Sequence, residues 1–76
     1  MAIALRLTKL SDDGRAVTYS FGAPEGPQRT LIFDRVDERI WPEDERRDGA
    51  FRAAAGKLAR VWNENGDVPE TLTYQA

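Results

Sequence analysis

The sequence contains neither cysteine nor histidine, and these two absences exclude several classes of protein. Without cysteine the chain forms no disulfide, and without either residue it lacks the usual ligands of a structural zinc site. The Ser–His and Cys–His pairs of nucleophilic enzymes are excluded as well. A chain of 76 residues must therefore be stabilised by packing, by strong local signals or by association with another chain.

Long hydrophobic runs and a strong charge of one sign are also missing. No segment approaches the roughly 18 apolar residues of a membrane span. Residues 1–7 lack the basic start of a secretory signal, and Arg6 and Lys9 interrupt the apolar region that such a signal needs. We therefore expect a cytoplasmic protein with no membrane contact, and the lack of cysteine fits a reducing compartment.

The charge is nearly balanced, with 11 basic and 13 acidic residues and a net charge of −2. A domain that binds mainly phosphates is usually strongly basic, so nucleic acid is the less favoured partner. A hydrophobic content of 41% favours a folded core over disorder. The length fits a single domain over residues 1–76, and the excess of arginine over lysine is typical of a bacterial gene rich in GC.

Alternation of apolar and polar residues predicts strands at residues 3–10, 17–21 and 29–34. The first two flank a turn of small polar residues that ends at Gly14, which predicts a β-hairpin. Residues 35–41 allow two interpretations, because the third strand could continue through a bulge or the chain could turn back. Pro42, followed by three acidic residues, is typical of a first helical turn.

A helix is predicted over residues 50–65, with Asp48 as its N-cap and Gly66 just past its end. Its apolar side gathers Phe51, Ala54, Ala55, Leu58, Ala59, Val61 and Trp62. Residues 71–75 alternate again, as a last strand does. The fold class is therefore α+β, with two layers: a mainly antiparallel three- to four-stranded sheet in β-β-β-α-β order, with one amphipathic helix packed on one face.

The other face of the sheet should be solvated, because polar residues occupy its positions. They are Arg6, Thr8, Thr18, Ser20, Asp34, Thr71 and Thr73.

The sequence contains few residue patterns that are typical of a catalytic or metal-binding site. The densest carboxylate cluster lies at residues 43–48, and mixed charge beside a helix start is usually solvated surface. The acidic segments beside Gly14 and Gly66 do not have the spacing of a calcium loop. We expect no catalytic residue, no metal site and no cofactor, and hence a protein that is not an enzyme.

The leading hypothesis is a small non-enzymatic bacterial protein-interaction module, acting as an adaptor, an inhibitor or an immunity-type protein. Trp41 and the arginines around it form the expected surface, since tryptophan and arginine are enriched at binding hot spots. These arginines are Arg35, Arg39, Arg46 and Arg47.

The alternative is a nucleic-acid-associated regulator that uses the basic helix face of Arg52, Lys57 and Arg60. Against it, the aromatic residues of the strands share the parity of the core, so they are not available for stacking with bases. Pairing of free sheet edges in a homodimer is a further alternative.

Overall fold

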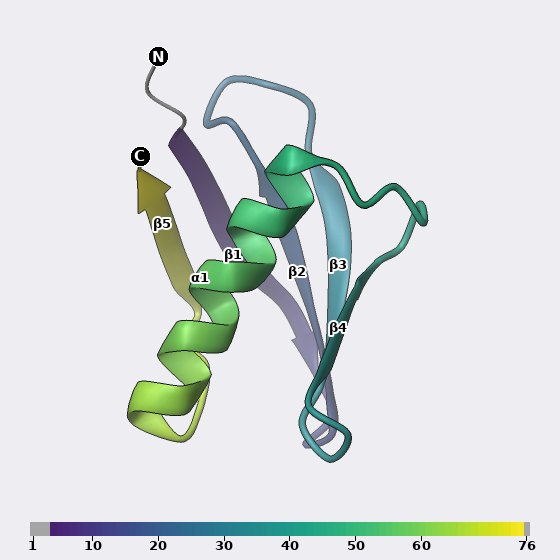
Figure 1. Ribbon diagram of the computed structural model, residues 1–76, viewed down its shortest axis with the longest axis vertical. Coiled ribbons are helices and arrows are strands. Elements are labelled where there is room, and N and C mark those ends of the chain that lie inside the picture. The colour runs from purple at the N-terminus through teal and green to yellow at the C-terminus, as the bar shows by residue number, and fades with distance from the viewer. Residues whose placement is uncertain (1–3, 76) are drawn as a thin grey trace.

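A computed structural model describes residues 4–75 as one antiparallel sheet with one helix lying diagonally across it (Figure 1). The elements are β1 (Ala4–Asp12), β2 (Ala16–Gly22), β3 (Arg29–Asp34), β4 (Arg39–Pro42), α1 (Gly49–Asn65) and β5 (Thr71–Gln75). The five strands lie in the order β4-β3-β2-β1-β5, so β4 and β5 form the two edges. The predicted two-layer α+β class is confirmed.

The sheet has five strands rather than three or four, because the ambiguous segment turns back and forms β4. The Asp34 carboxylate organises this turn by accepting a backbone N–H from Val36 at 2.8 Å. Glu38 adopts a positive φ of 54°, and the chain then returns with Trp41 opposite Ile32. The observed order is therefore β-β-β-β-α-β.

The helical turn expected after Pro42 is wrong, because Pro42 ends β4 and a turn follows. The N–H of Glu45 donates to the Pro42 carbonyl at 3.1 Å, and Glu45 has a positive φ of 62°. The predicted N-cap is confirmed, since the Asp48 carboxylate accepts the N–H of Phe51 at 3.0 Å. Gly66 closes the helix in the left-handed conformation, as expected.

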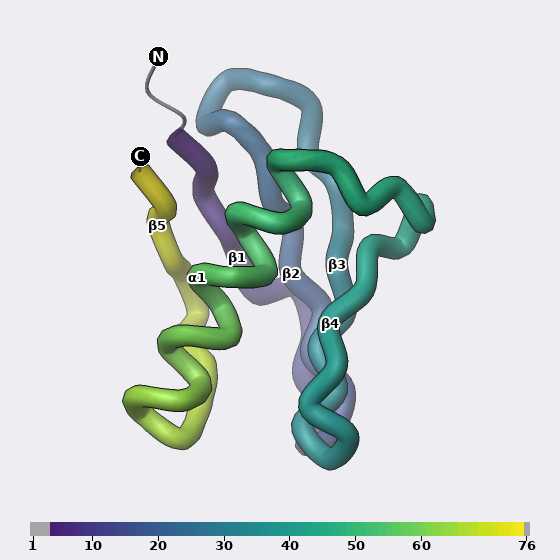
Figure 2. The backbone as a smooth tube through the Cα atoms, in the orientation of Figure 1, coloured from purple at the N-terminus to yellow at the C-terminus, as the bar shows by residue number. Residues whose placement is uncertain are grey.

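The core lies between α1 and the face of the sheet that it crosses. Its strand residues are Leu5, Leu7, Val17, Tyr19, Phe21, Leu31 and Phe33. The Tyr19 hydroxyl donates to the Pro69 carbonyl, which fastens β2 to the segment between α1 and β5. Figure 2 shows that segment turning back from the end of α1 so that β5 lies alongside β1. The helix therefore contacts β5 at one edge of the sheet and also packs on β1, β2 and β4 as it crosses.

The opposite face carries the predicted polar residues, all of them exposed or half-buried. Ile32 and Trp41 lie on this face and are half-buried. Leu10 lies at the irregularity in the β1–β2 pairing and is 58% exposed. The prediction of a largely solvated face is therefore confirmed.

Candidate binding groove between helix α1 and strand β5

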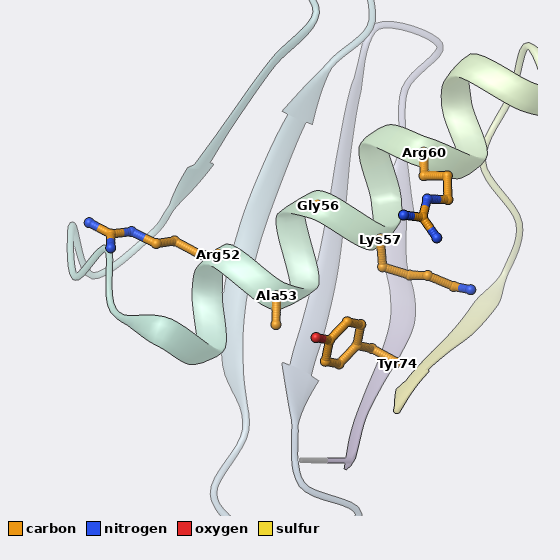
Figure 3. Close-up of a pocket in the computed structure, with 6 residues that line it drawn as sticks. All are labelled: Arg52, Ala53, Gly56, Lys57, Arg60 and Tyr74. Atoms are coloured by element: carbon orange, nitrogen blue, oxygen red, sulfur yellow. The ribbon is translucent and has the colours of Figure 1, made fainter. Parts of the chain in front are cut away.

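A groove of about 260 Å³ opens between α1 and the edge strand β5 (Figure 3). It is lined by Arg52, Ala53, Gly56, Lys57, Arg60 and Tyr74. The lining thus combines three cations, two small residues and one phenol. All three cations of the predicted helix face contribute to it.

Helix geometry explains why these cations share one side of α1. Arg52, Gly56 and Arg60 are four residues apart and follow one another along the exposed surface. Lys57 is half-buried and extends from α1 toward β5 (Figure 3). The opposite side of the helix buries Phe51, Ala54, Leu58 and Val61. The pattern that packs α1 on the sheet therefore also places the cations at the groove.

Tyr74 forms the wall of the groove that belongs to the sheet. It pairs with Leu5 of β1 and lies on the helix side of β5, as Leu72 does. Its ring rises from β5 beneath Ala53 and is half-buried (Figure 3). The groove therefore has an apolar floor with a hydroxyl at its side. Lys57 and Arg60 lie beside this floor, while Arg52 lines the far end with its guanidinium directed away from Tyr74 (Figure 3).

The groove cations have no partner within residues 4–75, where Arg52, Lys57 and Arg60 form no ion pair and no side-chain hydrogen bond. The sequence contributes no carboxylate at residues 49–63 or 71–75. Residues 49–63 and 71–75 therefore offer no carboxylate that would compete with an incoming anion for the three groove cations. A ligand carboxylate would gain charge-assisted hydrogen bonds without displacing an internal one.

Gly56 is unusual because it lies in the interior of α1, where glycine costs about 1 kcal/mol relative to alanine. A methyl group at this position would have no atom within 4 Å, so packing inside the described chain does not require glycine. The missing side chain lowers the rim of the groove between Arg52 and Arg60. An approaching chain could therefore come close to the helix backbone here.

The five residues of the leading hypothesis do not form one surface. The side chain of Arg35 is only 16% exposed. Its guanidinium donates hydrogen bonds to the Asp12 carboxylate at 2.6 and 2.7 Å and to the Asp67 carboxylate at 3.0 Å. Arg46 pairs with Asp48 at 3.2 Å. Arg35 therefore joins the β1–β2 turn to the segment before β5, and Arg46 supports the start of the helix.

The remaining three residues of that hypothesis do come together. Arg39, Trp41 and Arg47 line a second hollow of about 340 Å³, together with Pro42 and Glu45. Trp41 is half-buried there. Glu45 brings a carboxylate into this hollow, so the hollow carries both signs of charge. The charged residues that line the α1–β5 groove are all cations.

Arg29 has the most extensive polar contacts of the arginines, although sequence reasoning placed it in no candidate site. Its guanidinium binds Asp44 at 2.8 and 3.0 Å and Asp48 at 2.8 and 3.0 Å. It also lies 4.8 Å from the centre of the Phe21 ring. Hydrogen bonds from Arg29 and from the Arg46 N–H lower the pKa of Asp44 to about 2. This Arg29 cluster joins β3 to the N-cap of α1.

The carboxylates whose pKa is shifted are Asp12, Asp13, Asp34, Asp44, Asp48 and Asp67. In each case hydrogen bonds from arginine side chains or backbone N–H groups lower the pKa. A general acid at neutral pH needs a raised pKa, so these six groups are not suited to that role. No group of three metal-binding side chains occurs in the part of the chain that the structure describes.

Sequence reasoning identified the basic helix face. The alternation that puts Tyr74 on the core side of its strand is confirmed, since Tyr74 packs against the buried core, but its place in the groove wall was not predicted. The alternation of residues 71–75 was the available signal, because it places Leu72 and Tyr74 together on the side that faces the helix. Comparisons with protein-family models, with curated proteins and with solved structures find no match to this chain. Among residues 4–75, no helix is long and apolar enough to cross a membrane.

Proposed function

We propose that this protein is a small non-enzymatic interaction module that binds an acidic protein segment in the α1–β5 groove. Such a module could act as an adaptor, an inhibitor or an immunity-type protein. The observation that carries the proposal is that Arg52, Lys57 and Arg60 line one groove and have no ion-pair partner in residues 4–75. Carboxylates are the protein groups that such cations bind best.

A protein segment suits this groove better than a nucleic acid. Three cations would neutralise only about three phosphates, which gives weak binding at physiological salt. The groove contains a single aromatic ring, that of Tyr74, whereas proteins that bind single strands stack successive bases on several aromatic side chains. The net charge of −2 opposes a long polyanion but has little effect on a short acidic segment.

The hollow around Trp41 remains a predicted second contact for a larger protein partner. It borders β4, at the opposite edge of the sheet from β5, so a short peptide bound in the groove is not expected to reach it. Arg39 and Arg47 form no ion pair within residues 4–75, and Trp41 offers apolar area. Arg35 and Arg46 already bind carboxylates of the chain itself, so they have less to offer a partner.

The second candidate remains a nucleic-acid-associated regulator, because the same three groove cations would contact phosphates. Salt separates the two candidates, since phosphate contacts release counterions and make affinity fall steeply as salt rises. Three phosphate contacts on a single strand would lower affinity roughly twentyfold over a fourfold rise in salt.

The test measures fluorescence anisotropy with two labelled probes, an oligoglutamate peptide and a single-stranded oligonucleotide, over a series of salt concentrations. The variant Lys57→Glu/Arg60→Glu changes the groove, and Arg39→Glu/Arg47→Glu changes the net charge equally in the other hollow. We expect the first variant to weaken peptide binding at least about tenfold and the second to change it less than about twofold. Equal losses in both variants would contradict the groove as the site, and tighter, steeply salt-dependent oligonucleotide binding would favour the second candidate.

A further inference from the structure

The outer edge of β5 has no neighbouring strand in residues 4–75, and its backbone orientation follows from one hydrogen bond. The Lys9 N–H donates to the Glu70 carbonyl at 2.7 Å, immediately before the pair Thr8–Thr71. Hydrogen-bonded and non-hydrogen-bonded pairs alternate in an antiparallel ladder. The backbone groups of Thr71, Thr73 and Gln75 therefore point outward from the sheet.

This edge lacks the features that usually prevent pairing with another chain. Exposed edges are normally protected by charged residues, by proline or by bulges. Residues 71–75 contain no charged residue, no proline and no glycine. Instead they alternate threonine with leucine and tyrosine, which suits a strand that has neighbours on both sides.

The groove lies on the helix side of the same edge. An added strand would place every second side chain on that side, next to Leu72 and Tyr74. Lys57 extends from α1 toward β5, so its charge is within reach of those side chains (Figure 3). Acidic residues at alternate positions would meet the cations, while the positions between them would face solvent beside Thr71 and Thr73.

We propose that the acidic partner segment binds as a sixth strand, paired with the outer edge of β5, and that its alternate carboxylates enter the α1–β5 groove. This inference rests on the proposed function and names the form in which the partner binds. Backbone hydrogen bonds would supply affinity, and the groove cations would select the sequence.

A second copy of the chain fits this edge less well than an acidic segment does. Pairing β5 with β5 would bring two sets of Arg52, Lys57 and Arg60 beside each other, and like charges oppose such an interface. Charge complementarity therefore favours a different, acidic chain.

The first test uses two peptides of equal composition, one in which glutamate and valine alternate and one in which the glutamates form a block. We expect the alternating peptide to bind at least about tenfold more tightly, because only it can direct all its carboxylates to one side of a strand. Amide hydrogen exchange on the complex should slow at Thr71, Thr73 and Gln75, whose N–H groups are free on the outer edge.

A matched pair of variants tests the same pairing from the protein. Thr73→Pro removes an outward N–H and should lower the affinity for the alternating peptide at least about tenfold, whereas Thr73→Val keeps the N–H and should change it less than about twofold. Equal binding of both peptides without slower exchange at Thr73 would overturn strand addition but would leave the proposed binding of acidic segments in the cationic groove standing. No binding of either peptide would overturn the proposed function as well, and slower exchange in the free protein that depends on its concentration would indicate a homodimer instead.

Discussion

The two edges of the sheet are built in opposite ways. On β4, the Glu43 N–H donates to the Thr30 carbonyl, so Ile40 and Pro42 are the residues whose backbone faces outward. Pro42 has no N–H, and Arg39 adds a charge to the same short strand. The β4 edge therefore offers a single outward N–H, whereas β5 offers three on an uncharged strand.

The arginines beside the two edges of the sheet also differ, in whether they are paired with a carboxylate. Beside β4, Arg29 and Arg46 bind carboxylates and hold the segment that leads into α1. Beside β5, Arg52 and Arg60 bind none within residues 4–75. A cation that has an internal partner stabilises the fold, and a cation without one is available to a ligand.

The largest effect should come from proline substitutions that probe the orientation of β5. Leu72→Pro removes a hydrogen bond to β1 as well as a half-buried side chain, and should cost about 3 kcal/mol or more of unfolding free energy. Thr73→Pro removes an N–H that points outward and makes no hydrogen bond to β1. It should therefore lower the unfolding free energy by only about 1 kcal/mol, because proline restricts φ. Urea denaturation measures both, and equal losses would show that the backbone orientation assigned to β5 is wrong.

The next effect compares a paired arginine with an unpaired one. Arg29→Ala removes the contacts to Asp44 and Asp48 and should lower the unfolding free energy by about 2 kcal/mol. Arg52→Ala should change it by less than about 0.5 kcal/mol, since Arg52 has no partner in the described residues. Chemical denaturation of both variants checks this, and a larger loss for Arg52→Ala would remove the distinction between the two sides.

Acid should weaken the β4 side through the Arg29 cluster. Asp44 has a pKa of about 2 in the folded protein, below its ordinary value of 3.8, and Arg29 lowers the pKa of Asp48 as well. The unfolded chain takes up these protons at a higher pH than the folded chain does. The stabilisation that these two carboxylates provide is therefore fully present above about pH 5, and it is lost as the pH drops from about 4 toward 2. Thermal melts across this range should show a shallower decline in Arg29→Ala than in the original protein, and identical slopes would argue against the cluster.

The smallest effect concerns Gly56. Gly56→Ala should raise the unfolding free energy by about 0.5–1 kcal/mol, because the new methyl group meets no atom of the described chain. The same change should weaken binding of the alternating peptide if the ligand approaches the helix backbone there. Asn63→Ala, at an exposed position two helical turns later and outside the groove lining, provides a comparison for the helix effect. A gain in stability for Gly56→Ala with unchanged affinity would place the ligand away from Gly56.

Local signals explain most of what the sequence predicted. The hairpin, the Asp48 cap and the helix end at Gly66 each depend on residues close together in the chain. Strand β4 could not be assigned, because its turn depends on the Asp34 side chain and its strand on pairing with β3. Four residues carry too little alternation to predict a strand by themselves.

The candidate site was predictable only in part, for a similar reason. Helical spacing placed Arg52, Lys57 and Arg60 on one face. It could not indicate that Arg35 meets Asp67, which lies 32 residues away along the chain. Which cations are already bound within the fold, and which are free to bind a ligand, depends on such distant contacts.

The most direct test of the groove beside β5 is a titration of the isotope-labelled protein with the alternating glutamate–valine peptide, followed through the backbone amide resonances. We predict that the largest shift changes fall on the groove side, at Gly56, Lys57 and residues 71–75, while residues 39–47 change little. Changes centred on Arg39, Trp41 and Arg47 would contradict this account and place the binding surface at the β4 edge.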